Sequence, residues 1–241
     1  MTSRAVERRR AASPAAGAGV SVGRPPWWLV AVCVLLTAAV SWALLAGTWV
    51  GALDDRVAAV VGGWDLRHAP AYPLLWVFTQ FGGRVTILVV LAVLVGYLFW
   101  RWRTVVPLLR VVLALALLTA VVYAFKYGMG RTAPAYPGSY FHRDGESFPS
   151  GHVANAVLMW GVARWLAVDC ALPVRTQRAF RWLSLAGPVL AAVSVLVLDF
   201  HWVTDVVVGA AVGVILLGVV HTLDAFVLSR WVRARAGRES A

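Results

Sequence analysis

The chain has 241 residues, of which 61% are hydrophobic and only 14% are charged, a composition too apolar for a soluble domain of this size. Its net charge is +11, but the arginines are dispersed over the ends of apolar runs and form no basic stripe with aromatic side chains, which excludes nucleic acid as a partner. The sequence therefore predicts an integral membrane protein, with no disulfide between Cys33 and Cys170 because they fall at different predicted depths.

Residues 1–26 combine several arginines with Ala, Ser, Gly and Pro, a composition that predicts a disordered tail. The apolar run from Trp27 to Val50 is longer than a signal-peptide core, and no clear small-x-small cleavage site follows it. We interpret it as a retained membrane helix. The next segment, 51–83, is too polar and too rich in Gly and Pro to span, although Val57–Val61 and Leu74–Phe81 are expected to form short helices at the interface.

Five more apolar stretches follow, each near the roughly 20 residues that cross the hydrocarbon core. They are Arg84–Trp100, Thr104–Phe125, His152–Val168, Leu183–Leu198 and His201–Val227. A hydrophilic loop, Lys126–Pro149, separates the second of these from the third, and a short polar connector with Arg175, Arg178 and Arg181 precedes the fourth. The sequence thus predicts an all-α fold, a six-transmembrane-helix bundle over residues 27–228, followed by a basic tail at 229–241.

The arginines predict how the bundle is oriented. With the N-terminus inside, the tail, the turn at 101–110, the connector at 164–181 and the C-terminus share one face and carry most of the basic residues. Both termini are therefore predicted to be cytoplasmic, in a multi-pass protein of the cell membrane. Arg110, near the start of its span, is expected to extend toward the near surface.

The motif Phe148-Pro149-Ser150-Gly151-His152 stands directly before an apolar helical run. Ser150 is the expected N-cap, so the free backbone N–H groups at Ser150, Gly151 and His152 predict an anion site at the helix start. The imidazole of His152 can donate a proton near neutral pH. Taken alone, the motif is also compatible with an ordinary capped turn.

His201 and Asp205 are four residues apart in a stretch that reads as helical, so their side chains are expected on one face. A carboxylate that accepts the Nδ1–H of His201 leaves Nε2 free as a nucleophile or base. The alternative is a pair that only anchors the sixth span. The predicted topology puts His201, His152 and the loop 126–149 together on the extracytoplasmic face.

Three basic residues of the loop are candidates to offset phosphoryl charge: Lys126, the only lysine of the chain, Arg131 and Arg143. No metal-ligand set is visible, because His68, His142 and His221 lack carboxylate or thiolate neighbours at ligand spacing. We therefore expect no metal ion and no cofactor.

These motifs resemble those of the type 2 phosphatidic acid phosphatase family, whose fold is shared with vanadium haloperoxidases. Its first motif is a lysine followed, after six residues, by Arg-Pro. Lys126 and Pro134 match this motif, and Ala133 stands in place of the arginine. Its second motif, Pro-Ser-Gly-His, is intact at 149–152. Its third motif is Ser-Arg, then His after five residues, then Asp after three more. Here Ser194, His201 and Asp205 match, and Val195 stands in place of the arginine.

The resemblance implies a phosphohistidine mechanism. A site that opens on the outer face at the headgroup level would meet a lipid phosphate or a polyprenyl diphosphate, which is the expected substrate class. His201 would be the nucleophile, Asp205 its orienting residue and His152 the general acid, and Lys126, Ser150 and Gly151 would bind the phosphate. Arg131 is expected to replace the arginine absent at position 133, because it lies two residues before it. The alternatives are a phosphotransferase of the same fold or a non-catalytic lipid-binding or transport protein. The sequence does not indicate the oligomeric state.

Overall fold

The computed structural model describes residues 23–136 and 140–228, and within these ranges it is built of helices, with one isolated β-bridge between Arg131 and Phe141. The predicted all-α fold is confirmed. Most of the predicted N-terminal tail and the whole of the predicted basic tail at 229–241 lie outside the described residues.

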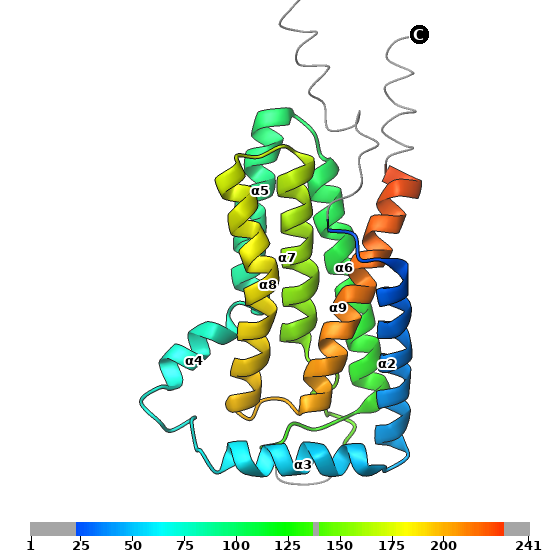
Figure 1. The fold of residues 1–241 in the computed structure, drawn as a ribbon, viewed down its shortest axis with the longest axis vertical. Coiled ribbons are helices and arrows are strands. Elements are labelled where there is room, and N and C mark those ends of the chain that lie inside the picture. Colours follow the sequence, from blue (N-terminus) through cyan, green and yellow to red (C-terminus); the bar gives the residue numbers. More distant parts are fainter. Residues whose placement is uncertain (1–22, 137–139, 229–241) are drawn as a thin grey trace, which may run out of the picture.

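In the part of the chain that the structure describes, six long helices run side by side (Figure 1). They are α2 (Trp27–Leu45), α5 (Arg84–Trp102), α6 (Val106–Met129), α7 (Gly151–Asp169), α8 (Val174–Val197) and α9 (Val203–Leu223), which continues into the π-helical turn η2 (Asp224–Leu228). Two shorter helices, α3 (Trp49–Gly62) and α4 (Tyr72–Thr79), connect α2 to α5. The beginning of α2 and the end of α9 lie at the same end of the bundle (Figure 1).

Within the described ranges, five of these helices are long and apolar enough to cross a membrane: α2, α5, α6, α8 and α9. The predicted count of six spans is therefore not confirmed, since α7 does not meet that measure of apolarity. The reason lies in its position, because α7 packs against α5, α6, α8 and α9. A helix enclosed by other helices faces little lipid, so its side chains need not be uniformly apolar.

The core is centred on α7, where Leu158, Val162 and Leu166 are fully buried. Small residues let α9 come close to it. A Cβ atom at Gly213 would lie 2.6 Å from the Cβ of Val157 on α7, so only glycine fits there. The small-residue face of α9 therefore serves helix packing.

Several helix boundaries differ from the prediction, including the end of α2 at Leu45 rather than Val50. Helix α8 begins at Val174 rather than Leu183, so the arginines of the predicted connector lie within the helix. Arginine is a good helix former, and a helix can continue beyond its apolar part. Helix α6 continues to Met129, which puts Lys126 in its last turn, and ends at Gly130, whose φ of 59° is left-handed.

Arg110 does not extend toward the surface as expected. Its side chain is buried, with Nε 2.8 Å from Asp224 Oδ1 and Nη1 2.5 Å from Asp169 Oδ2. The expectation was wrong because α7 and η2 bring two carboxylates to it, which compensates the charge inside the bundle.

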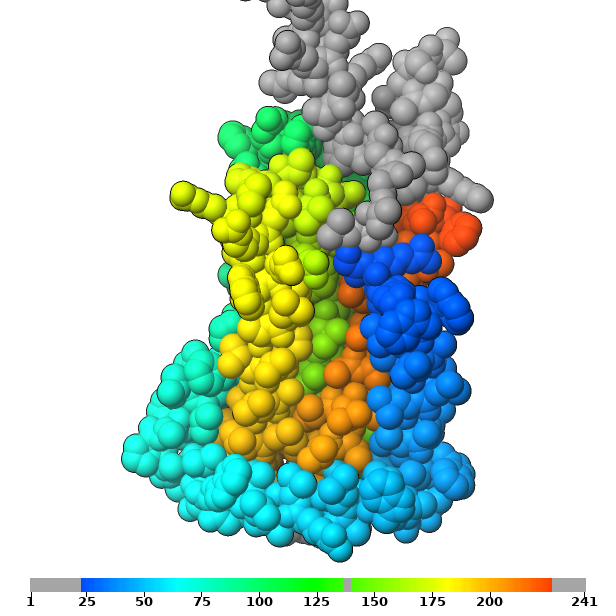
Figure 2. Space-filling model, viewed as in Figure 1, coloured from blue at the N-terminus to red at the C-terminus, as the bar shows by residue number. Residues whose placement is uncertain are grey.

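Helix α3 lies across one end of the bundle and covers that end in the space-filling view, whereas α4 lies at the side of the bundle, against α8 (Figures 1 and 2). Short helices were predicted within this segment, but α3 is longer than expected and α4 begins earlier. Helix α3 exposes Trp49, Leu53 and Val60, whereas its Asp54 is buried at 1% exposure. A carboxylate buried on an otherwise surface helix needs partners inside.

Candidate active site

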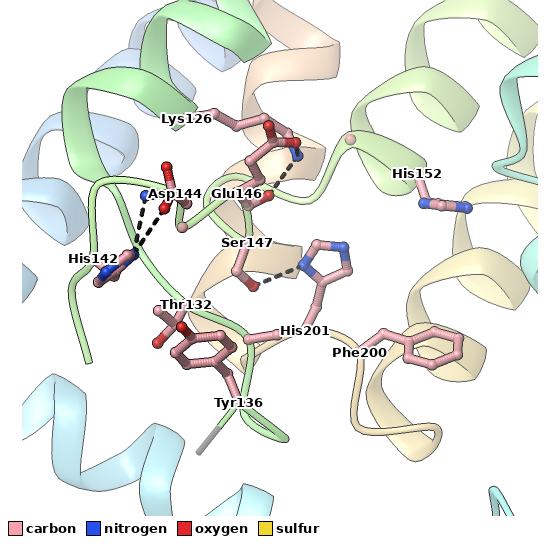
Figure 3. Close-up of a pocket in the computed structure, with 13 residues that line it drawn as sticks. Lys126, Thr132, Tyr136, His142, Asp144, Glu146, Ser147, His152, Phe200 and His201 are labelled. Carbon is pink, nitrogen blue, oxygen red and sulfur yellow. Dashed lines mark hydrogen bonds and ion pairs between the residues drawn. The ribbon is translucent and has the colours of Figure 1, made fainter. Parts of the chain in front are cut away.

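The candidate site lies at the end of the bundle that α3 covers, where α6 ends and α7 and α9 begin. A cavity of about 400 Å³ opens there (Figure 3). It is lined by residues from the end of α6, the following loop, the start of α7 and the connection before α9, namely Lys126, Thr132, Ala133, Tyr136, His142, Asp144, Gly145, Glu146, Ser147, Gly151, His152, Phe200 and His201.

His152 lies in the first turn of α7 and borders the cavity. The turn before α5 packs directly on this helix start. A Cβ atom at Gly82 would lie 2.5 Å from the carbonyl oxygen of His152, and the Asn155 side chain donates a hydrogen bond of 2.9 Å to the Gly82 carbonyl. The first turn of α7, which carries His152, is therefore held against the turn before α5.

His201 borders the same cavity but lies just before α9, not within it as expected. Asp205 folds back to the helix start, where its Oδ2 accepts the backbone N–H of Trp202 at 3.1 Å. This N-terminal cap brings Oδ2 to 3.4 Å from His201 Nδ1. The two side chains are close because of a cap, rather than because they share a helix face.

Ser147 lies between these two groups and was not singled out from the sequence. Its Oγ is 2.5 Å from Asp205 Oδ2 and 3.2 Å from His201 Nδ1. The hydroxyl can donate to Asp205 while it accepts the Nδ1–H of His201, which leaves Nε2 with its lone pair. In Figure 3, the Nε2 edge of the His201 ring points to the side of the cavity where His152 lies. No local motif marks Ser147, because its partners are more than 50 residues away.

Lys126 supplies a cation to the cavity. Its Nζ donates a hydrogen bond to the carbonyl of Glu146 and lies 3.7 Å from Oε2 of the same residue. His142 also borders the cavity, with Nδ1 3.5 Å from Asp144 Oδ2. Two carboxylates and one ammonium therefore line the cavity, so a bound phosphate would depend strongly on Lys126.

Arg131 is fully buried and does not line the cavity. Its Nη1 lies 2.6 Å from Asp205 Oδ1 and its Nη2 lies 2.6 Å from Asp54 Oδ2. It also donates hydrogen bonds to Thr204 and Tyr140. Burial alone would lower the pKa of Arg131, but the carboxylates of Asp205 and Asp54 raise it above its ordinary value, so the guanidinium stays charged.

The expectation that Arg131 replaces the missing phosphate ligand is therefore wrong, since both terminal nitrogens are held by carboxylates. Arg143 is no substitute, because its side chain is 89% exposed beside Asp144 and outside the cavity lining. Ala133 borders the cavity where the resemblance expects an arginine, whereas Val195 is completely buried against Val153 and Val206.

Ser150 occupies the N-cap position of α7, but its backbone N–H is not free for an anion. It donates to the carbonyl of Asp205 at 2.9 Å, which contradicts that part of the prediction. Helix α9 touches this turn, since a Cβ atom at Gly209 would lie 2.6 Å from the Ser150 carbonyl oxygen. Gly151 does border the cavity, at the positive end of α7.

Within residues 23–136 and 140–228, no group of three or more His, Cys, Asp or Glu side chains is placed to hold a metal ion. The chemistry that the described residues offer is instead a pair of imidazoles, one backed by a carboxylate and a hydroxyl, with a lysine nearby.

Comparison with known proteins gives the same fold and family. A solved transmembrane PAP2 type phosphatidylglycerolphosphate phosphatase from Bacillus subtilis superimposes with a TM-score of 0.62 over 83% of this chain and 98% of that one, at 20% sequence identity. This likeness, together with the apolar helices, identifies a multi-pass membrane protein.

A lipid A 1-phosphatase from Porphyromonas gingivalis is 33% identical over 108 residues, which cover 43% of this chain and 20% of that protein. The match thus spans about a fifth of the relative's length. The family model of the PAP2 superfamily matches residues 107–227, half of the chain and all of the elements that carry the cavity's two histidines. The chain belongs to the PAP2 superfamily.

Proposed function

We propose that the protein is a membrane lipid-phosphate phosphatase that works through a phosphohistidine at His201. The observation that carries the proposal is the meeting of His152 and His201 at one cavity, with Asp205 and Ser147 behind the second ring. Nucleophile, base-orienting carboxylate and proton donor are the parts that such a double displacement needs.

In the first step, Nε2 of His201 attacks phosphorus in line with the bond to the leaving oxygen. The N–P bond forms, the P–O bond to the lipid breaks, and protonated His152 gives its proton to the leaving oxygen. The imidazolium character that develops on His201 is stabilised by Asp205, directly and through the Ser147 hydroxyl.

In the second step, water attacks the phosphorus and His152 accepts its proton. The P–N bond breaks and inorganic phosphate leaves, which restores both imidazoles. Lys126 and the backbone N–H of Gly151 at the start of α7 are the proposed partners of the phosphoryl oxygens, since both residues line the cavity. The reaction as written needs no metal ion.

The substrate class is a lipid with a phosphate or diphosphate headgroup. The names of the two relatives, a lipid A 1-phosphatase and a phosphatidylglycerolphosphate phosphatase, favour phosphorylated lipids. The charge distribution of the sequence favours cytoplasmic termini. A cavity at the opposite end of the bundle would then be extracytoplasmic, at the level of the outer headgroups (Figure 1).

The test is phosphate release by the protein purified in detergent, on a panel of lipid monophosphates and diphosphates. We expect release from at least one lipid, inhibition by vanadate, and an acid-labile phosphohistidine that disappears in His201→Ala. Release by His201→Ala at the wild-type rate would contradict the assignment of the nucleophile.

A phosphotransferase is the second candidate, favoured by the small Ala133 side chain on the cavity wall, which leaves room for an acceptor alcohol. Adding glycerol or another alcohol to the same assay separates the two activities. A transferase forms the phosphorylated alcohol in place of free phosphate, whereas a hydrolase releases phosphate at an unchanged rate.

A further inference from the structure

We propose that Arg131 and Asp54 are positioning residues for the reaction, and that they hold Asp205 fixed and negatively charged behind His201. This inference rests on the proposed function. It assigns a role to a buried ionic group, made of Asp54, Arg131 and Asp205, that the reaction steps above do not use.

The Asp205 carboxylate is held at both of its oxygens. Arg131 contacts Oδ1 of Asp205, whereas Ser147, Trp202 and His201 all approach Oδ2. Both carboxylate oxygens therefore have partners, and the carboxylate has no freedom to rotate away from the imidazole. Arg131 thus acts on the nucleophile through Asp205.

The buried ionic group carries a net negative charge. Arg131 alone would neutralise Asp205 and weaken its attraction for the imidazolium that forms on His201. Asp54 shares the guanidinium at the same distance of 2.6 Å, so the three groups together keep one negative charge. Formation of the imidazolium then brings the buried cluster to neutrality.

Asp54 is itself anchored to the start of α9. Its Oδ1 accepts the backbone N–H of Thr204 at 3.0 Å and its Oδ2 accepts the Thr204 hydroxyl at 2.5 Å, so α3 is fixed to the first turn of α9. The rings of Tyr140 and Trp202 enclose the guanidinium, at 4.8 and 5.0 Å from its central carbon. Water has little access to the pair, and the interaction is therefore strong.

The experiment compares Arg131→Met, Arg131→Lys and Asp54→Asn with wild type in the phosphate-release assay, with kcat and KM measured separately and vanadate affinity as a binding readout. Arg110→Met is the matched control, because Arg110 is also buried between two aspartates but lies outside the cavity lining. Thermal unfolding of every variant reports the structural part of each effect.

We expect kcat to fall roughly 10- to 100-fold in Arg131→Met, by analogy with residues that orient a metal-bound histidine from behind, with KM and vanadate affinity unchanged. Arg131→Lys should recover part of this loss, and Asp54→Asn should lower kcat by about tenfold. Arg110→Met should lose thermal stability and keep its kcat.

Three results would overturn the inference. A raised KM and weaker vanadate binding at unchanged kcat in Arg131→Met would make Arg131 a phosphate ligand. Equal kcat losses in Arg131→Met and Arg110→Met would reduce both to fold stabilisation. A wild-type protein without activity on any lipid phosphate would contradict the proposed function itself. The wild-type measurement distinguishes this failure from a failure of the inference about Arg131 and Asp54.

Discussion

Two arginines near opposite ends of α6 are buried in the same way, yet only one is connected to the proposed reactive groups. Arg131 bridges Asp54 and Asp205 beside the cavity, and Arg110 bridges Asp169 and Asp224 at the far end. A buried arginine between two carboxylates is therefore not in itself a sign of chemistry. What distinguishes the two ends is a cavity with an imidazole edge open to it.

The far end of the bundle also contains a histidine. His221 is buried there, and its ring lies 3.9 Å from that of Trp165, which in turn lies 4.2 Å from the central carbon of Arg110. His221 is 3% exposed and does not border the cavity that holds His152 and His201. Each of the following predictions compares the cavity end with its counterpart.

The largest difference is expected between the two histidines. His201→Ala should lower turnover by at least about 1,000-fold, because the proposed covalent intermediate cannot form without its nucleophile. His221→Ala should keep wild-type turnover. Initial rates of phosphate release, corrected for folded protein, measure both. A His221→Ala variant as inactive as His201→Ala would show that the far end takes part in the chemistry.

The next difference is expected between Asp205→Asn and Asp224→Asn. Asp205→Asn should lower kcat by about 100-fold or more, since the amide no longer stabilises the imidazolium. Asp224→Asn should keep its kcat but lose about 3–5 kcal/mol of unfolding free energy, the usual cost of removing one partner of a buried ion pair. Denaturant unfolding in detergent and steady-state kinetics separate the two effects. A wild-type kcat in Asp205→Asn together with a lowered kcat in Asp224→Asn would contradict the assignment of chemistry to the cavity end.

A smaller effect is expected for Ser147→Ala. The hydroxyl mediates between His201 and Asp205, but the direct contact of 3.4 Å remains when it is removed. We therefore expect kcat to fall about tenfold with KM unchanged. Ser184→Ala, on an exposed turn of α8, is the matched control. A Ser147→Ala enzyme with full turnover would mean that Asp205 orients the imidazole unaided.

The smallest effects concern two glycines. Gly82→Ala would bring a methyl group 2.5 Å from the His152 carbonyl oxygen, a backbone atom that cannot move independently. Gly218→Ala at the far end would meet side-chain atoms of Val30, at 2.9 Å, and of Pro25, at 3.5 Å, and no backbone atom. We expect Gly82→Ala to lose about 1–3 kcal/mol of stability and part of its activity, and Gly218→Ala to lose less stability and no activity. Thermal unfolding and turnover give the comparison, and a more severe Gly218→Ala would contradict it.

The sequence predicted the residues that meet at the cavity better than it predicted their contacts. His152, His201 and Lys126 were chosen from short motifs, and all three line one cavity. The all-α class followed from the apolar runs. Helix ends such as the start of α8 were missed because arginines can extend a helix beyond its apolar part.

The role of Arg131 was misjudged because proximity along the chain was the only guide. Its partners are Asp54, 77 residues away, and Asp205, 74 residues away, and no local pattern reveals either pairing. Ser147 was missed for the same reason. Short motifs therefore indicate which groups line the cavity, whereas the residues that hold them depend on long-range packing.

The close approach of Gly209 to Ser150 has a consequence for how this protein can diversify. Helix α7 carries the proposed proton donor and α9 follows the proposed nucleophile. The two helices touch backbone to backbone, so this seam tolerates almost no added volume. The opposite wall consists of loop residues such as Ala133, Tyr136 and His142. Adaptation to a new headgroup, natural or engineered, is thus expected to rewrite that loop and leave the seam unchanged.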